Sequence, residues 1–559
     1  MHNIRLQLLA SGLGISLTIP LQAQPPEKWS EGEIEKVEIQ ITKEKQITLP
    51  QANRFFEKIP PRPAEPIKPA ITYNFKNLSF NTPDYNPAIR PLRLQNEPIS
   101  KIYGNYVSAA FGNYASAFID AYATTKRDKD KFYGFKVSHL GFGRGPVDGN
   151  NSAASNSQLR LFGKGFGRQV TTGGYLDYER IGTHFYGYAP GTDINRELIR
   201  QVYNIVGVGG EIENTASGKL NYKVKGAFSY LDDHYRAKES EVNVGFTGDY
   251  ELSKTSKMVF GTDYYLVTRK DAAIEAKPRH LFKAKGAYQF YLVDDLLFSA
   301  GATIAFENDT LGKAKDLHLY PDFRASYPLS PSVEVYATLT GDMDKVSLHT
   351  LARENAWINA NVGTYHTNRT VEFLGGIRGK LGSKVSYATG LSFANLKNWY
   401  FYINDDTDPS KFNVAYDEGN TKRTNFFGEL SFAHAETARV SLRGDYFGYG
   451  TGDLSEAWHR PKYRLGVTTA FNLYSKLLFN VDALAQGGAK ARVYDGDAAI
   501  YLTTTLPAAF DLNAKLSYLF SKQFSMFVKG NNLLSNEYPI YLNYPVRGLN
   551  VMGGITWVF

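Results

Sequence analysis

The chain has 559 residues, a formal net charge of +8 at pH 7 and no cysteine, which excludes disulfides, thiol catalysis, zinc–cysteine sites and a lipid-anchor cysteine. Its basic residues are spread along the whole chain, so we expect no nucleic-acid partner. Mean hydropathy is −0.34 and no run of about 18 apolar residues follows the N-terminal segment, which excludes a bundle of membrane-spanning helices.

Residues 1–23 form a predicted signal peptide. His2 and Arg5 precede an apolar stretch from Leu8 to Leu21, and Ala23 supplies the small residue that signal peptidase needs. An uncleaved membrane anchor is the alternative, but two glycines interrupt the stretch and it is short for a spanning helix. The sequence therefore predicts an exported protein.

Residues 24–100 are predicted to be an extended periplasmic arm or the remnant of a plug. The segment opens with acidic residues, and prolines from Pro60 to Pro98 keep it from forming a packed domain. An extended alternating segment can pair with the open edge of a partner's sheet. The residues expected to bind such a partner are Val37, Glu38, Ile39, Gln40 and Ile41.

From about residue 101 to Phe559 the sequence predicts an all-β fold, a transmembrane antiparallel β-barrel. Segments of about ten alternating residues recur, as tilted membrane strands require. Tyr222, Val224 and Phe228 share one parity, while Lys223 and Lys225 share the other. Such strands turn an apolar face toward outer-membrane lipid and a polar face toward a lumen. The abundance of tyrosine (38) and phenylalanine (35) suits the aromatic girdles of a barrel.

The connections between strands alternate in length. Short turns are expected near residues 252–256, 381–384 and 474–476, and long loops near 145–156, 187–200, 309–316, 346–369 and 403–424. A soluble β-sandwich would also alternate in polarity, but its connections would be similar at both ends. Short periplasmic turns and long outer loops are typical of membrane barrels. We count about 22 strands, an even number that leaves both termini in the periplasm.

The last strand carries a predicted insertion signal. Val551, Ile555, Trp557 and Phe559 lie on one parity, and the chain ends on the aromatic Phe559. Such a strand offers an unpaired edge to another barrel. We expect Trp557 and Phe559 to be recognised by the barrel-insertion machinery of the bacterial outer membrane.

Two stretches resemble TonB-dependent receptors. The sequence FVKGNNLL (527–534), followed by Tyr538, by YPVRG (544–548) and by the closing strand, resembles the C-terminal end of that family. The patches GGIRG (375–379) and LKNWYFYI (396–403) are similar to its mid-barrel strands. The resemblance covers about residues 100–559 and implies a receptor or transporter for a solute.

The chain departs from that family in one respect, because residues 24–100 are too few for a full plug. A barrel of 22 strands without a plug would leave a wide hole, so we predict that the lumen is filled. The candidates are the arm from Thr48 to Ser100, inward-folded loops, bulky lumen side chains or a partner protein, and the arm is the first choice.

Catalytic and cofactor signals are absent from the sequence. The ten histidines form no metal-ligand motif, so we expect neither an enzyme nor a cofactor. One acidic segment has the hard oxygen ligands that Ca²⁺ prefers, with a solvated acidic loop as the alternative. Its candidate metal ligands are Asp405, Asp406 and Asp408.

Two functions remain open on these observations. The first is a receptor or transporter that moves or binds a solute, energised by TonB through residues 37–41. The second is a non-transporting barrel subunit of an outer-membrane complex, whose N-terminal arm docks another envelope protein. The sequence names no solute for the first function.

Overall fold

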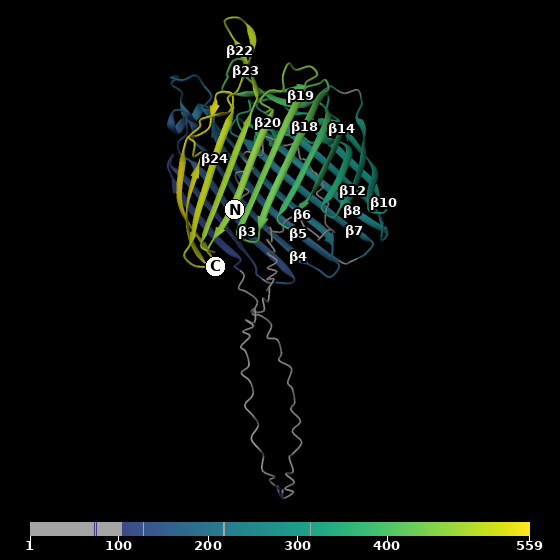
Figure 1. Cartoon of the computed structure of the whole chain (residues 1–559). Helices are drawn as coiled ribbons and strands as arrows, with labels where there is room; N and C mark the ends of the chain where they lie inside the picture. The colour runs from purple at the N-terminus through teal and green to yellow at the C-terminus, as the bar shows by residue number, and fades with distance from the viewer. Residues whose placement is uncertain (1–71, 73, 75–102, 127, 216–217, 313–314) are drawn as a thin grey trace, which may run out of the picture. The chain divides into compact units, whose positions relative to one another are not determined.

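Backbone hydrogen bonds join 22 antiparallel strands into one closed ring (Figure 1). The protein's structure is a computed structural model, and it describes residues 72, 74, 103–126, 128–215, 218–312 and 315–559. Each barrel strand pairs with the barrel strands before and after it, and β1 (Asn105–Gly112) pairs with β28 (Asn550–Val558) to close the ring. The predicted all-β barrel of 22 antiparallel strands is therefore confirmed.

The remaining elements follow in chain order. The other barrel strands are β2 (Ser116–Thr124), β3 (Lys131–Phe142), β4 (Ala154–Phe166), β5 (Val170–His184), β6 (Arg200–Asn214), β7 (Leu220–Asp233), β8 (Lys238–Ser253), β9 (Ser256–Lys270), β10 (Arg279–Val293), β11 (Leu296–Glu307), β12 (Leu317–Ser330), β13 (Val333–Asp344), β14 (Thr367–Leu381), β15 (Val385–Lys397), β18 (Thr421–His434), β19 (Ala438–Gly450), β20 (Tyr463–Leu473), β21 (Leu477–Gly487), β24 (Ala509–Leu519) and β25 (Phe524–Asn531). Outside the ring lie the hairpins β16 (Trp399–Asn404) with β17 (Phe412–Asp417), β22 (Lys490–Asp495) with β23 (Ile500–Thr505), and β26 (Pro539–Tyr541) with β27 (Tyr544–Pro545). Helix α2 (Leu348–Glu354) and the 3-10 turns η2 (Gly149–Ser152) and η3 (Arg196–Ile199) lie in loops.

The two faces of the wall differ as the alternation predicts. Val224 and Phe228 of β7 are 39% and 42% exposed on the outward face. On the inner face, the Nζ atom of Lys223 lies 2.7 Å from a carboxylate oxygen of Glu211 on the neighbouring strand. An apolar exterior with paired charges inside is what a barrel in lipid requires.

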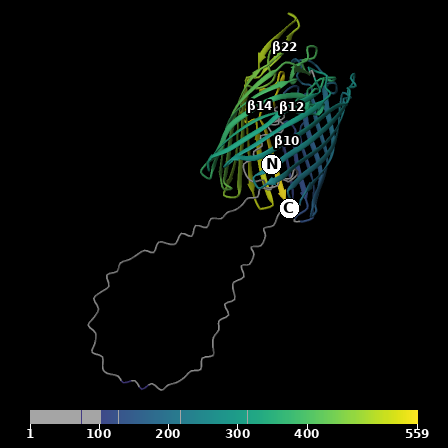
Figure 2. The ribbon, with the colours of Figure 1, turned by 90° about the vertical axis from the view of Figure 1, so that its right-hand side faces the viewer.

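The long connections all leave one end of the ring, and the chain terminus Phe559 lies at the other (Figure 2). The turns at the Phe559 end are short, for example 254–255, 382–384 and 474–476. The other end carries the loops 185–199, 345–366, 398–420, 451–462, 488–508 and 532–549. In a membrane barrel the long loops face outward from the cell, so this end is the outer mouth. One segment predicted to resemble a mid-barrel strand differs: Trp399–Asn404 lies in a loop hairpin, β16, and not in a barrel strand.

Several predictions fall outside the described residues. The signal peptide, the partner-binding segment Val37–Ile41 and, apart from Thr72 and Asn74, the arm up to Ser100 belong to them. Among the described residues, no helix is long and apolar enough to cross a bilayer.

The terminal strand gives a first testable prediction. Trp557 is 53% exposed on the outward face, its ring lies 4.6 Å from that of Phe559, and Phe559 exchanges backbone hydrogen bonds with Asn105. Replacing Trp557 and Phe559 with Ser removes the apolar signal but no backbone donor. We expect most of the protein to remain unassembled, measured as loss of the heat-modifiable folded band on gels of outer membranes.

The matched control is Phe393→Ser on β15, which removes an aromatic ring 49% exposed on the same outward face. It should assemble at nearly normal levels. Normal assembly of the Trp557→Ser/Phe559→Ser variant, or equal loss in both variants, would contradict the role of the terminal strand.

Candidate functional site: a loop cap in the outer mouth

Five loops of the outer mouth share one buried core. We call them the loop cap: residues 185–199, 345–366, 398–420, 451–462 and 532–549. Their core is continuous with the inner wall and contains Tyr186, Tyr203, Ile205, Leu231, Ala237, Val346, Leu348, Leu351, Ala352, Ile358, Val362, Ala394, Leu396, Trp399, Tyr400, Phe401, Tyr402, Phe412, Ala457, Trp458, Tyr541 and Tyr544. Burying this many large side chains makes the cap a packed structure and not a set of solvated loops.

Three rings from distant parts of the wall meet in this core. The ring of Tyr186 lies 4.7 Å from that of Tyr544 and 5.6 Å from that of Trp357, and the last two lie 4.1 Å apart. We call these three residues the aromatic junction. Their loops start after β5, β13 and β25, which are eight, eight and six strands apart around the ring. Loops from all sides therefore meet over the lumen.

The β13–β14 loop, residues 345–366, is held by inner-wall residues of β8 and β5, five and eight strands from β13 around the ring. Glu239 of β8 accepts hydrogen bonds from the amides of Leu348 and His349, at 2.8 and 3.0 Å, at the start of α2. Lys345 pairs with Glu241 at 2.6 Å, and Arg353 pairs with Glu179 of β5. The loop is thus folded inward and fixed to wall strands distant from the two that it connects.

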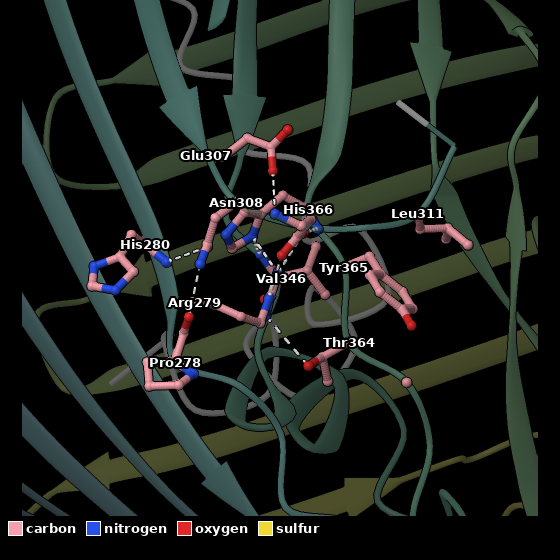
Figure 3. A network of polar contacts seen from close by, with 12 residues as sticks. Pro278, Arg279, His280, Glu307, Asn308, Leu311, Val346, Thr364, Tyr365 and His366 are labelled. Carbon is pink, nitrogen blue, oxygen red and sulfur yellow. Dashed lines mark hydrogen bonds and ion pairs between the residues drawn. The ribbon is translucent and has the colours of Figure 1, made fainter. Parts of the chain in front are cut away.

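A buried polar network anchors the ends of the same loop (Figure 3). The guanidinium of Arg279 donates to both carboxylate oxygens of Asp309 at 2.6 and 2.8 Å, and to the carbonyl of Val346 at 2.8 Å. The imidazole Nδ1 of His366 accepts from Val346 N at 3.1 Å and faces Arg279 at 2.9 Å. Burial lowers the pKa of His366 to about 3, so this ring is neutral and able to accept.

A second buried ion pair joins the β13–β14 loop to the β19–β20 loop, residues 451–462. Arg460 donates to Glu354 at 2.7 Å and to the carbonyl of Tyr400 at 3.2 Å, and Tyr400 donates its hydroxyl to Glu354 at 2.5 Å. The guanidinium also lies 5.1 Å from the ring centre of Trp399. Both charged side chains are under 8% exposed. Removing one partner of such a pair leaves the other charge buried and unpaired.

His459 links the cap loops through both ring nitrogens. Its Nδ1 lies 2.8 Å from the carbonyl of Tyr402 and donates to it, while Nε2 accepts from the amide of Leu542 at 3.3 Å. This arrangement needs a neutral imidazole, and burial lowers the pKa of His459 to about 4.

A small polar pocket lies near the Arg279 network. It has a volume of about 240 Å³ and is lined by residues of both signs, among them Glu307, His318, Lys397 and Asn398. Glu307 and His318 already bond each other at 3.1 Å. The pocket is large enough for a small polar solute, but too small for a drug-sized ligand.

The predicted metal ligands lie in the β16–β17 turn of the cap and point to protein donors. Asp405 accepts from Thr407 and Asn413, Asp406 pairs with Arg492 at 3.1 Å, and Asp408 pairs with Lys411 at 3.0 Å. Within the described residues, no three acidic or histidine side chains gather as a metal-binding set. These three residues therefore lie in one turn, but their carboxylates do not converge on a common position.

The cap residues that matter most were not singled out in the sequence. Glu354 and Arg460 lie 106 positions apart, and neither belongs to a motif. A usable signal was the density of aromatic residues in segments too short for barrel strands, such as Trp399–Tyr402 and Tyr538–Tyr544.

Comparisons with known proteins give structural likeness only. No protein-family model and no curated protein sequence matches the chain. Among solved structures, the FrpB iron transporter of Neisseria meningitidis is 10% identical with a TM-score of 0.64, covering 82% of each chain. The siderophore receptor PirA of Acinetobacter baumannii is 10% identical with a TM-score of 0.63, covering 83% of this chain and 81% of PirA. FpvA of P. aeruginosa, bound to pyoverdines, is 13% identical with a TM-score of 0.61, covering 82% and 72%.

The chain has the fold of outer-membrane siderophore receptors. The resemblance to TonB-dependent receptors is thereby confirmed at the level of the fold. These neighbours are receptors and transporters. Their ligands are properties of those proteins.

The ion pair gives a second prediction. Replacing Arg460 with Met leaves the carboxylate of Glu354 buried and unpaired, which lowers the stability of the cap by about 3–5 kcal/mol. We expect faster amide hydrogen exchange in residues 345–366 and 398–420, measured by mass spectrometry. The double variant Glu354→Met/Arg460→Met should recover much of the protection, because no charge stays unpaired.

The control is Arg492→Met, which breaks the more exposed pair with Asp406 and should cost about 1 kcal/mol or less. If the cap amides of Arg460→Met exchange as slowly as those of the native chain, the buried pair does not hold the loops together.

The buried histidines give a third prediction. Burial lowers the pKa of His349 and His366 to about 3 and that of His459 to about 4, below the ordinary 6.5. A histidine whose pKa is lowered in the folded state makes its full contribution to cap stability above pH 6.5, the pKa of an unfolded histidine. That contribution is lost as the pH falls toward the folded-state pKa, about 4 for His459 and about 3 for the other two. At pH 5 the loss is about 2 kcal/mol per histidine.

Protection factors of the cap amides, corrected for intrinsic exchange, should therefore fall between pH 7.5 and 5. His459→Gln should show a smaller fall, while His434→Gln, exposed at the last residue of β18 and at the opposite end of the barrel, should behave as the native chain. Equal protection at both pH values would contradict the prediction.

Proposed function

We propose that this chain is an outer-membrane receptor-type barrel with a gated outer mouth, which conducts nothing at rest and moves a solute inward only when the loop cap rearranges. The observation that carries the proposal is the aromatic junction, where loops from three sides of the ring meet over the lumen. The fold shared with solute receptors supports the uptake role.

The cap also bears on the prediction that the lumen is filled. The sequence favoured the N-terminal arm, but the inward-folded β13–β14 loop, an alternative to it, is fixed to inner-wall residues of β5 and β8. We propose that the loop cap is the outer barrier. Rearrangement would need work, and an envelope partner, TonB or another protein, would supply it through residues 37–41.

A second function is favoured by one specific observation, the continuous burial of the cap core. Tyr203, Leu351, Leu396, Phe401, Phe412 and Tyr544 are fully buried in it. Opening such a core exposes a large apolar area to water, which is costly. A barrel that never opens would act as a non-transporting subunit of an envelope complex.

Planar-bilayer conductance tests the barrier. The native chain should show no steady conductance, while Trp357→Ala/Tyr544→Ala should conduct, because it removes two rings of the junction. Tyr474→Ala is the control, since that ring is 94% exposed at the opposite end. A large steady conductance of the native chain would refute a closed mouth.

A disulfide lock separates the two functions. The side chains of Asn359 and Asn413 meet at 3.3 Å across two cap loops, and the chain has no cysteine to interfere. Asn359→Cys/Asn413→Cys should complement the growth phenotype of a deletion strain when reduced and fail when oxidised if the cap is a gate. Complementation in both states would assign the non-transporting role.

A further inference from the structure

Basic side chains gather on the outward face of β3–β6, just beyond the apolar band on the outer side. Cross-strand registers place His139 opposite Ser157, Ser157 opposite Arg180, and His184 opposite Arg200. The same face carries Leu159 opposite Tyr178, and these two side chains are 37% and 36% exposed. The basic residues therefore face away from the lumen.

These residues line a groove of about 510 Å³. We call it the outer basic groove and define it by His139, Ser155, Arg180, His184, Arg196 and Arg200. Its walls also include small and apolar residues such as Ala117 and Val202. Charged and apolar surfaces are thus combined in one depression on the membrane side of the barrel.

Each arginine of the groove is held in place by a neighbour. Arg180 donates to Ser155 at 3.0 Å. Arg196 donates to His184 Nε2 at 3.2 Å, and His184 is fixed in turn by donating Nδ1–H to the carbonyl of Ala153 at 2.8 Å. Guanidinium groups held by neutral partners keep donors free for a ligand.

The charge balance of the groove is positive. Glu197 is the one acidic residue that lines it within the described chain, and it pairs with Arg200 at 3.3 Å. Arg180 and Arg196 pair with no carboxylate among the described residues. Asp232, on the same outward face of β7, lies outside the groove and accepts from Asn204 at 3.3 Å. Two uncompensated guanidiniums favour an anion with fork-like oxygen geometry, such as a phosphate.

The height of the groove identifies the source of the phosphate. Tyr178 lies at the edge of the apolar band. Arg180 lies two residues further along the strand, or about 7 Å beyond that edge. This is the level where the headgroups of outer-leaflet lipids lie beside a barrel, with their acyl chains along Leu159, Tyr178 and Val206. We propose that the outer basic groove binds a phosphorylated glycolipid of the outer leaflet, with Arg180, Arg196 and Arg200 on the phosphate.

The test uses the full chain in detergent, titrated with diphosphoryl lipid A, monophosphoryl lipid A and inorganic phosphate, with bound lipid counted by native mass spectrometry. The variant is Arg180→Gln/Arg196→Gln/Arg200→Gln. Loss of even one charge-assisted contact weakens binding about tenfold, so we expect at least that change in Kd for diphosphoryl lipid A.

The matched control removes three cations from the same rim at outward positions of other strands, Lys238→Gln/Lys270→Gln/Lys422→Gln. Its Kd should stay within about twofold of the native value, since exposed charges away from the site contribute little. The conservative variant with Lys at all three groove positions should bind between the native chain and the Gln variant. Heat modifiability confirms that every variant forms the barrel.

Equal losses in the groove variant and the rim control would overturn the proposal. So would equal affinity of the native chain for diphosphoryl lipid A and for inorganic phosphate, because the site would then be an anion site without a lipid. A lower Kd for diphosphoryl than for monophosphoryl lipid A, lost only in the groove variant, supports it.

Discussion

A strand in lipid must have every backbone donor and acceptor paired, and the rest of this structure depends on that constraint. Twenty-two strands meet it only because β28 returns to β1, with Phe559 hydrogen-bonded to Asn105 at the seam. Closure fixes the diameter, and a ring this wide cannot be filled by the side chains of its own wall. At the outer mouth, the loop cap fills the space that the wall side chains leave.

The polar inner face of the wall allows loops to be buried inside the barrel. A loop that enters a lumen brings backbone amides and carbonyls that need partners. Glu239 meets the first amides of α2, and Arg279 meets the carbonyl of Val346. Charged side chains of the wall therefore supply the hydrogen-bond partners that water supplies to an exposed loop. The aromatic junction then fills the space where the loops meet.

Much of the barrel was predictable from the sequence, because membrane strands obey a period-two rule that each segment shows by itself. Tyr222–Tyr230 displays both faces without reference to any neighbour, and strand count and turn lengths follow. The closing strand was recognisable by its one-parity apolar face for the same local reason. Its role in insertion stays a prediction.

The cap was not predictable, because its contacts are nonlocal. Nothing in the sequence near Glu354 indicates Arg460, and nothing near Tyr186 indicates Tyr544. The run Trp399–Tyr402 was assigned to a barrel strand since alternation cannot tell a wall strand from a loop hairpin. The acidic turn at Asp405–Asp408 has suitable oxygen atoms, but their directions depend on donors from distant segments such as Arg492.

The shared core also bears on how such a surface can change over generations. A solvated receptor loop tolerates insertions, whereas each cap loop packs against others, so a length change in one would disturb all five. The tip of the β22–β23 hairpin, residues 496–499, is exposed and stands beyond the rim (Figure 1). A change of length on this face is therefore expected to disturb the fold least at that hairpin.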